Sequence, residues 1–160
     1  MKGMDGISPC SRWEINIMVF AFFSLLITYL SLKLPDRIYD YRSWFYRERK
    51  WERRGRIYQS LFRVKAWKNR MPELSDFVKS VYPKKHIGKY SRKNLTVYLK
   101  ESCRAELTHA AIICSSLLFR FWNDIVDTLI VLLIAFLINI PYIIIQRYNR
   151  PRITAMLEYV

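Results

Sequence analysis

Two long runs of the chain contain apolar residues and no charge, and a third run is less pure. Residues 15–32 hold a single amide, Asn16, and residues 128–146 are uncharged as well. Eighteen residues at about 1.5 Å each make roughly 27 Å of helix, which is close to the hydrocarbon thickness of a bilayer. Because backbone groups in lipid need internal hydrogen bonds, each crossing must be helical. We therefore expect an all-α integral membrane protein with about three transmembrane helices, at about 15–34, 105–122 and 126–146.

The middle run, 105–122, contains Glu106, His109 and Arg120, and its assignment as a span depends on the loop charges. Between Pro35 and Cys103 there are 19 Lys and Arg residues, against two before the first span and one between the second and third. The positive-inside rule places the 35–103 segment in the cytoplasm. Three spans, with the N-terminus outside and the C-terminus cytoplasmic, then agree with the charge of every loop. We therefore expect a multi-pass protein of the cell membrane.

The first span is predicted to be a retained anchor and not a cleaved signal peptide. Its flank is weakly charged, since Lys2 and Arg12 are balanced by Asp5 and Glu14. The run is long, and no small-x-small cleavage site follows it.

Composition narrows the class of protein further. The 160 residues carry a net charge of +14 and are 52% hydrophobic, which excludes a disordered chain. Three widely spaced cysteines exclude a disulfide-built secreted module. We expect a single membrane domain, 1–160, whose cytoplasmic segment 35–103 carries amphipathic interfacial helices.

Residues 41–70 alternate basic and aromatic side chains, a pattern with two interpretations. One is a nucleic-acid surface, with arginine on phosphates and rings stacked on bases. The other is a pair of helices, broken near Gly55, lying on the anionic inner leaflet. In its second half Ile57, Leu61 and Val64 would share a helical face, and Trp44, Trp51 and Trp67 suit the headgroup layer. Flanking membrane spans favour the second interpretation, so no nucleic-acid partner is expected.

The remainder of the loop offers little chemistry. Pro72 and residues 82–88 mark turns, 76–81 is expected to be a short helix, and His86 is interpreted as a solvated side chain. The sequence has no Gly-rich phosphate loop, no GxSxG, no HExxH and no paired cysteine motif. Two scattered histidines and three isolated cysteines do not suffice for a metal site, and no cofactor is expected.

One candidate site opens the second span. Glu106 and His109 are three residues apart, so on a helix they share a face. A carboxylate beside an imidazole can fix its tautomer and support its positive charge, as a general base requires. The alternative is a buried pair that holds helices together. Cys103, beside Arg104, is a further candidate as an acyl-carrying nucleophile, although a lone cysteine there is more often only tolerated.

A second candidate cluster closes the third span. Pro141 is expected to loosen the helix one or two turns before its end. The polar residues around the exit are Asn139, Gln146, Arg147, Asn149, Arg150 and Arg152. Three guanidiniums with amides between them suit a phosphate or oxyanion site. The alternative is a routine basic flank, for which any mixture of Lys and Arg would serve, whereas all three bases here are Arg.

These residues carry a family resemblance. Motifs between Leu34 and Leu157 include Arg104-Ala-Glu-Leu-x-His109, Asn139-x-Pro141 and Gln146-Arg-Tyr-Asn-Arg-Pro-Arg152. The chain resembles the glycosyl-4,4'-diaponeurosporenoate acyltransferases, small membrane enzymes of staphyloxanthin-type carotenoid biosynthesis. The resemblance implies esterification of a sugar hydroxyl of a glycosylated carotenoid acid with a fatty acyl chain. It also implies functional positions at Glu106, His109, Asn139, Gln146, Arg147, Asn149, Arg150 and Arg152.

The resulting hypothesis is an O-acyltransferase acting on a carotenoid or similar glycolipid acceptor among membrane lipids. His109, oriented by Glu106, would deprotonate the sugar hydroxyl, and Arg147, Arg150 and Arg152 would bind the acyl donor. Asn139 would hold polar sugar or carbonyl groups deeper in the span. Further substrate-binding candidates are Gln146, Asn149 and Arg104. That donor would be an acyl-CoA or an acyl carrier protein. A different class remains open, namely a non-catalytic small membrane subunit that recruits a partner or anionic lipid through its basic face.

Overall fold

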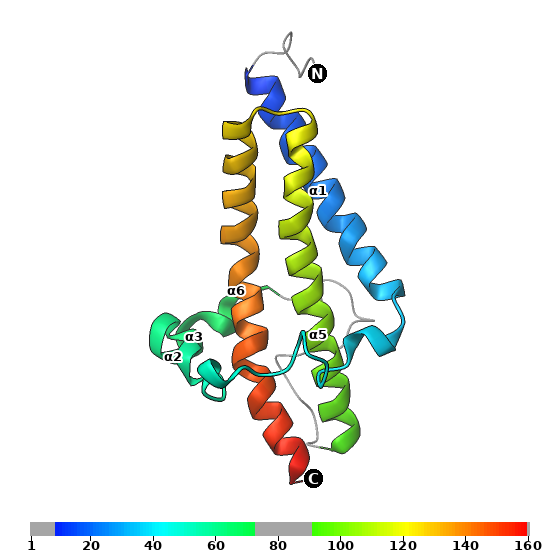
Figure 1. The fold of residues 1–160 in the computed structure, drawn as a ribbon, viewed down its shortest axis with the longest axis vertical. Helices are drawn as coiled ribbons and strands as arrows, with labels where there is room; N and C mark the ends of the chain where they lie inside the picture. Colours follow the sequence, from blue (N-terminus) through cyan, green and yellow to red (C-terminus); the bar gives the residue numbers. More distant parts are fainter. Residues whose placement is uncertain (1–8, 73–90, 160) are drawn as a thin grey trace. The chain divides into compact units, whose positions relative to one another are not determined.

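The computed structural model describes residues 9–72 and 91–159, and within these ranges the chain is helical with no strand (Figure 1). The elements are α1 (Pro9–Lys33), η1 (Asp36–Tyr39), η2 (Lys50–Glu52), α2 (Arg56–Phe62), α3 (Val64–Trp67), η3 (Lys68–Arg70), α5 (Arg92–Ser115), η4 (Ser116–Phe121) and α6 (Ile125–Glu158). The all-α prediction is confirmed for these residues. The short helix at 76–81, the turn at 82–88 and His86 lie outside the described ranges.

Two of the described helices are long and apolar enough to cross a membrane, namely Cys10–Lys33 of α1 and Ile125–Glu158 of α6. In the most apolar 18-residue stretch of each helix, only 11% and 28% of the residues are buried, whereas the core helix of a globular protein is mostly buried. This exposure is compatible with membrane association. The expected middle span, 105–122, consists of the end of α5 and the 3₁₀ helix η4, and α5 is not among the two. The number of spans stays a prediction.

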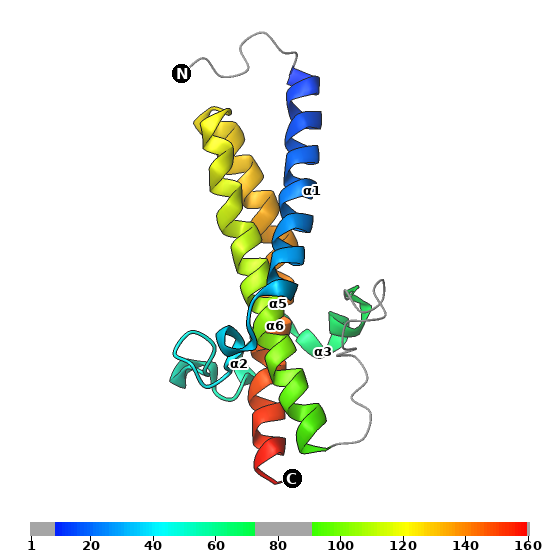
Figure 2. The same cartoon turned by 90° about the vertical axis from the view of Figure 1, so that its right-hand side faces the viewer.

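The chain forms two compact units, Met1–Leu34 with Leu107–Pro141 and Pro35–Glu106 with Tyr142–Val160. In the first unit, α1 runs beside a hairpin made by the second half of α5, η4 and the first half of α6 (Figure 2). Phe119 of η4 is fully buried and contacts the rings of Phe20 and Phe23 at 6.5 and 6.4 Å. Asn16 and Asn123 exchange amide hydrogen bonds of 3.0 Å in both directions, which satisfies both buried side chains.

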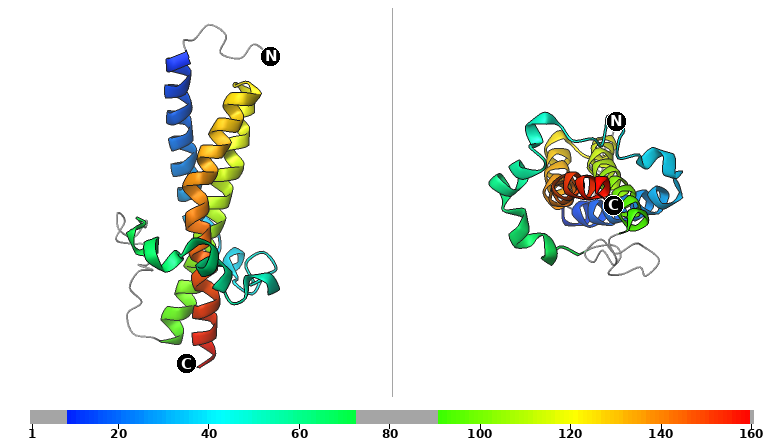
Figure 3. Two further views of the ribbon diagram at one scale, coloured as in Figure 1. Left: turned by 90° about the vertical axis from the view of Figure 1, so that its left-hand side faces the viewer. Right: turned by 90° about the horizontal axis from the view of Figure 1, so that it is seen from below.

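The second unit is built on the first half of α5 and the last part of α6. Leu95 and Leu99 of α5 pack against Ile153 and Leu157 of α6 in a buried cluster. Seen from below, residues 35–70 pass around the C-terminal part of α6 (Figure 3). This course brings the backbone at 45–47 to the side chains of α6.

The structure corrects the expected helix pair at 41–70. Residues 41–49 form turns and not a helix, and the first regular helix, α2, begins at Arg56. The break near Gly55 is confirmed, since Arg53, Arg54 and Gly55 all have positive φ. The apolar face predicted for Ile57, Leu61 and Val64 is wrong: Val64 is fully buried, whereas Leu61 is 67% exposed. The reason is that Arg63, also left-handed, ends α2 and reorients the chain before Val64.

The expected end of the last helix is also wrong. Pro141 does not precede the helix end by one or two turns, because α6 continues to Glu158 and passes through Pro151 as well. A proline inside a helix removes one backbone hydrogen bond, yet α6 is continuous through both prolines.

Candidate functional site

A network of buried charges lies in the second unit, with Glu106 at its centre. Glu106 is 3% exposed; its carboxylate accepts a hydrogen bond from Arg147 and forms an ion pair with Arg150, both on α6. The Nε of Arg147 lies 2.6 Å from its Oε1, and the Nη2 of Arg150 lies 2.6 Å from its Oε2. Arg147 and Arg150 are three residues apart and so share a helix face. The carboxylate therefore joins α5 to one face of α6.

Arg150 uses both terminal nitrogens of its guanidinium inside the protein, while its buried Nε has no hydrogen-bond partner among the described residues. Its Nη1 donates to the Tyr46 carbonyl at 2.9 Å, and its Nη2 donates to the carbonyl and hydroxyl of Ser102 at 3.1 and 3.2 Å. The residue is 3% exposed. Such a fork can bond several acceptors in one plane, which a lysine ammonium cannot do.

Glu52 is the second buried carboxylate of this network, at 1% exposure. Its Oε1 accepts from the Tyr58 hydroxyl at 2.6 Å and lies 3.5 Å from Nη1 of Arg147, and its Oε2 accepts from the Arg49 backbone at 2.7 Å. Burial and the hydrogen bond to Glu52 both raise the pKa of Tyr58, so it stays protonated and donates. Two carboxylates thus balance two guanidiniums.

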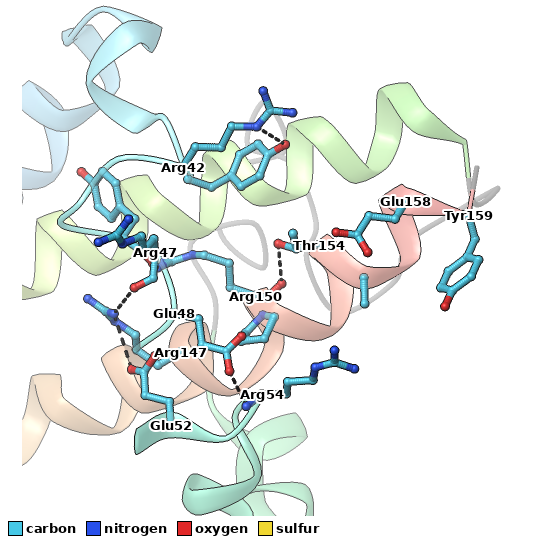
Figure 4. Close-up of a pocket in the computed structure, with 14 residues that line it drawn as sticks. Arg42, Arg47, Glu48, Glu52, Arg54, Arg147, Arg150, Thr154, Glu158 and Tyr159 are labelled. Atoms are coloured by element: carbon cyan, nitrogen blue, oxygen red, sulfur yellow. Dashed lines mark hydrogen bonds and ion pairs between the residues drawn. The ribbon is translucent and has the colours of Figure 1, made fainter. Parts of the chain in front are cut away.

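A cavity of about 420 Å³ borders this network (Figure 4). Arg147 and Arg150 line it from α6, and further arginines and glutamates come from the segment before α2. Its remaining charged and polar lining includes Arg42, Arg47, Arg54, Glu48, Glu52, Thr154 and Glu158. The volume falls within the range usual for small-molecule sites, and the positive groups exceed the negative ones.

The candidate base, His109, lies in the first unit. Its Nδ1 is 2.8 Å from the amide oxygen of Asn139, and the amide nitrogen of Asn139 donates to the Ala135 carbonyl at 2.8 Å. Asn139 is 3% exposed. Nδ1 of His109 is therefore paired with an amide that the sequence predicts to bind substrate. The hypothesis that Glu106 orients His109 joins residues of both units and stays a prediction.

The other candidate residues have separate surroundings in the second unit. Arg104 pairs with Glu101, lies 3.5 Å from Asp36 and stacks over the Tyr39 ring. Arg152 stacks over Tyr148 at 3.6 Å, and Asn149 accepts from Lys68 at 3.1 Å. Gln146 is 5% exposed, and its amide oxygen has no hydrogen-bond partner among the described residues.

Cys103 is fully buried, and this burial raises the pKa of its thiol to about 12. A thiol so strongly protonated is a poor nucleophile at neutral pH. The neighbourhood of Arg104, which suggested an activated thiolate, does not offset the loss of water around the sulfur.

Comparison with known sequences decides which class of protein this is. A profile of the glycosyl-4,4'-diaponeurosporenoate acyltransferase family matches residues 42–159, which is most of the chain. The chain belongs to this family. The matched range contains the whole charge network, the His109–Asn139 pair and all of the cavity lining except Tyr41.

Curated members of the glycosyl-4,4'-diaponeurosporenoate acyltransferases align over nearly the full chain. Proteins of that name from Staphylococcus aureus strains N315, bovine RF122 / ET3-1 and USA300 are each 27% identical over 141 residues, covering 88% of this chain and 85% of each relative. No solved structure matches. The chain is thus an acyltransferase of this carotenoid-pathway family, and the comparisons favour an enzyme over a non-catalytic subunit.

Sequence reasoning missed the roles of Glu52, Tyr58 and Ser102. Glu52 and Tyr58 lie far from any motif that bears catalytic chemistry, and Ser102, although next to Cys103, has no such role of its own. The α6 partners of Glu52 and Ser102 are about 50 to 95 residues away in sequence, and Tyr58 bonds Glu52. The one available indication was Glu52 itself, the acidic residue that precedes Arg53 and Arg54 in a strongly basic segment.

Proposed function

We propose that this acyltransferase is a membrane enzyme that esterifies a sugar hydroxyl of a glycosylated carotenoid acid, or of a similar glycolipid, with a fatty acyl chain. The family match over residues 42–159 carries the proposal. The exposed apolar surfaces of α1 and α6 support it, because a lipid acceptor is met most directly by an enzyme in the same bilayer.

The proposed topology keeps α1 and α6 as crossings, with 105–122 as a third. The N-terminus then lies outside and the C-terminus in the cytoplasm, as the 19 basic residues between Pro35 and Cys103 favour. A cytoplasmic second unit can receive a water-soluble acyl donor, either acyl-CoA or an acyl carrier protein.

We assign the general base to His109 on the strength of its hydrogen bond to Asn139. An amide oxygen can only accept, so the proton between the two side chains belongs to Nδ1 of the imidazole. The opposite orientation of the Asn139 amide would set two oxygens against each other at the Ala135 carbonyl. The neutral ring therefore carries its lone pair on Nε2, the nitrogen that accepts the substrate proton.

In the proposed reaction, Nε2 of His109 takes the proton of the sugar hydroxyl as its oxygen attacks the acyl carbonyl carbon. A carbon–oxygen bond forms, the carbon–sulfur bond of the thioester breaks, and the imidazolium returns the proton to the leaving thiolate. Asn139 acts as a positioning residue that stabilises the imidazolium through its amide oxygen.

For the second unit we propose donor binding in the cavity of Figure 4. Arg147 and Arg150 line it, and Glu106 holds both guanidiniums in place. Gln146, Asn149, Arg152 and Arg104 are proposed as further contacts to substrate. The unpartnered amide oxygen of Gln146 is suited to accept from a hydroxyl.

The test is expression of the chain in a host that supplies a glycosylated carotenoid acid, with lipid extracts analysed by mass spectrometry. Wild type should yield the acylated product, and His109→Ala should lower its formation by about 10²–10⁴, the usual contribution of a general base. His86→Ala, which removes the other histidine, serves as the control and should match wild type. Wild-type turnover by His109→Ala, present in the membrane fraction at normal level, would refute the base assignment.

A further inference from the structure

A second, open groove of about 780 Å³ lies in the second unit between η2 and α2. It is lined by Trp51, Arg53, Arg54, Arg56, Ile57, Ser60 and Leu61. Three of these seven residues are arginines and none is acidic. The groove therefore combines a strongly positive part with an apolar part, whereas the cavity beside Glu52 has mixed charges.

The arginines stand on a turn with an unusual backbone. Arg53 and Arg54 have φ of 50° and 55°, and Gly55 follows with φ of 74°. A left-handed conformation costs an ordinary residue about 1–2 kcal/mol, so two in succession need support from their surroundings. Support comes from Glu48, whose carboxylate accepts from the Arg54 backbone, and from Gly55, which packs directly against the Tyr148 carbonyl of α6.

The guanidiniums on this turn are not used for internal pairing. Arg53, Arg54 and Arg56 are exposed, and no carboxylate in the described part of the chain forms an ion pair with any of them. Arg147 and Arg150, by contrast, are bonded to Glu106 and to backbone carbonyls. The turn thus gathers three cations whose charge is available to an external anion.

The apolar part of the groove is equally open. Trp51 is 59% exposed and packs its ring at 6.1 Å from buried Tyr58, while Leu61 is 67% exposed. A small soluble anion would leave these two side chains in water. A neutral lipid would leave the three guanidiniums without a partner.

We propose that this groove binds an anionic phospholipid, with its phosphate on Arg53, Arg54 and Arg56 and its glycerol and acyl region against Trp51 and Leu61. Guanidiniums bond phosphate oxygens in pairs, and tryptophan favours the headgroup layer where one side of the ring is apolar. Of the residues that would hold the lipid, only Arg54 also lines the cavity proposed for the acyl donor, so the groove is a separate site that concerns how the enzyme binds its membrane.

Native mass spectrometry of the full chain in mild detergent tests the proposal, with dioleoyl phosphatidylglycerol and dioleoyl phosphatidylcholine as probes. Wild type should retain phosphatidylglycerol preferentially. The variant R53Q/R54Q/R56Q should bind it at least tenfold more weakly, with phosphatidylcholine binding unchanged. R56Q alone alters only the first turn of α2 and leaves the left-handed turn intact, so it should give a smaller loss in the same direction if the triple variant fails to fold.

A matched variant removes the same charge elsewhere. R70Q/R92Q/K93Q replaces three exposed basic residues outside the groove and should retain wild-type affinity for phosphatidylglycerol. An equal loss in this control would overturn the proposal in favour of net charge alone. Unchanged binding by R53Q/R54Q/R56Q or R56Q, or displacement of the lipid by equimolar palmitoyl-CoA at these arginines, would overturn it as well.

Discussion

Replacing Glu106 by leucine gives the sharpest test of the buried charge network. Glu106 is 3% exposed and contacts both Arg147 and Arg150. Together with Glu52 these residues hold two negative and two positive charges, which balance. The Glu106→Leu variant keeps one negative and two positive charges, an excess of one buried positive charge.

The expected loss of folding free energy in Glu106→Leu follows from the burial of the two arginines that Glu106 pairs with. Removing one member of a buried ion pair costs about 3–5 kcal/mol, because the remaining charge has neither partner nor water. Arg147 keeps Glu52 at 3.5 Å and is partly exposed, which favours the lower end of that range. For a chain of this size each kcal/mol shifts Tm by about 2–4 °C, so a loss of about 3 kcal/mol lowers Tm by roughly 6–12 °C.

The assay is tryptophan-fluorescence melting of the purified protein in mild detergent. Asp36→Asn serves as the control, because the Asp36 side chain pairs with Lys100 and Arg104 while remaining 66% exposed, and its loss should change Tm far less. The double variant Glu106→Leu, Arg150→Met restores charge balance and should melt above Glu106→Leu. The single variant Arg150→Met completes the comparison. If Glu106→Leu melted like wild type, or if the double variant melted below both Glu106→Leu and Arg150→Met, the argument from buried charge would be wrong.

Two further predictions concern Cys103 and Gly55. Burial raises the pKa of Cys103 from its usual 9.0 to about 12, which lowers its thiolate fraction at pH 8 roughly a thousandfold below that of an ordinary thiol. Iodoacetamide at pH 8 should therefore alkylate exposed Cys10 and spare Cys103, as measured by peptide mass spectrometry, and equal labelling would contradict this. Because the folded protein holds this thiol protonated, its effect on folding stability is fully favourable below pH 9 and is lost as the pH rises towards 12. Gly55→Ala should destabilise the folded protein by about 1–3 kcal/mol, because a Cβ would lie 2.8 Å from the Tyr148 carbonyl oxygen. Gly55→Asn should be destabilised as well, since its Cβ meets the same carbonyl. Ser60→Ala, at an exposed position of α2, is the control, and a wild-type Tm for Gly55→Ala would contradict the prediction.

Local patterns in the sequence were sufficient for the apolar helices and for one break. The uncharged run from residue 15 predicts a helix that the structure ends at Lys33, where Pro35 follows closely. Gly55, in a run of bulky and charged residues, marks the left-handed turn before α2. Both features depend on residues a few positions apart, so sequence alone contains the necessary information.

The extension of α6 beyond residue 146 could not be predicted from local sequence, because it involves contacts with residues far away along the chain. Gln146 to Arg152 looked like a helix exit because polar residues and Pro151 lie there, shortly after Pro141. Arg147 and Arg150 find acceptors at Phe45, Tyr46 and Glu106, and these contacts keep the helix intact to Glu158. No periodicity in the sequence reports that residues 45–46 return to α6. The pairing of His109 with Asn139, 30 residues away, was hidden for the same reason.

The choice of arginine at the end of α6 has a structural explanation as well as a functional one. A basic membrane flank is served equally by lysine, but Arg150 bonds the Tyr46 carbonyl, Ser102 and Glu106 through two nitrogens of one rigid plane. Lysine offers one nitrogen and would leave buried acceptors unmet. An all-arginine exit is therefore no independent sign of phosphate binding at Arg150. The better evidence for function comes from side chains whose arrangement is not needed to hold the fold together, above all the His109 ring, which Asn139 holds in one tautomer.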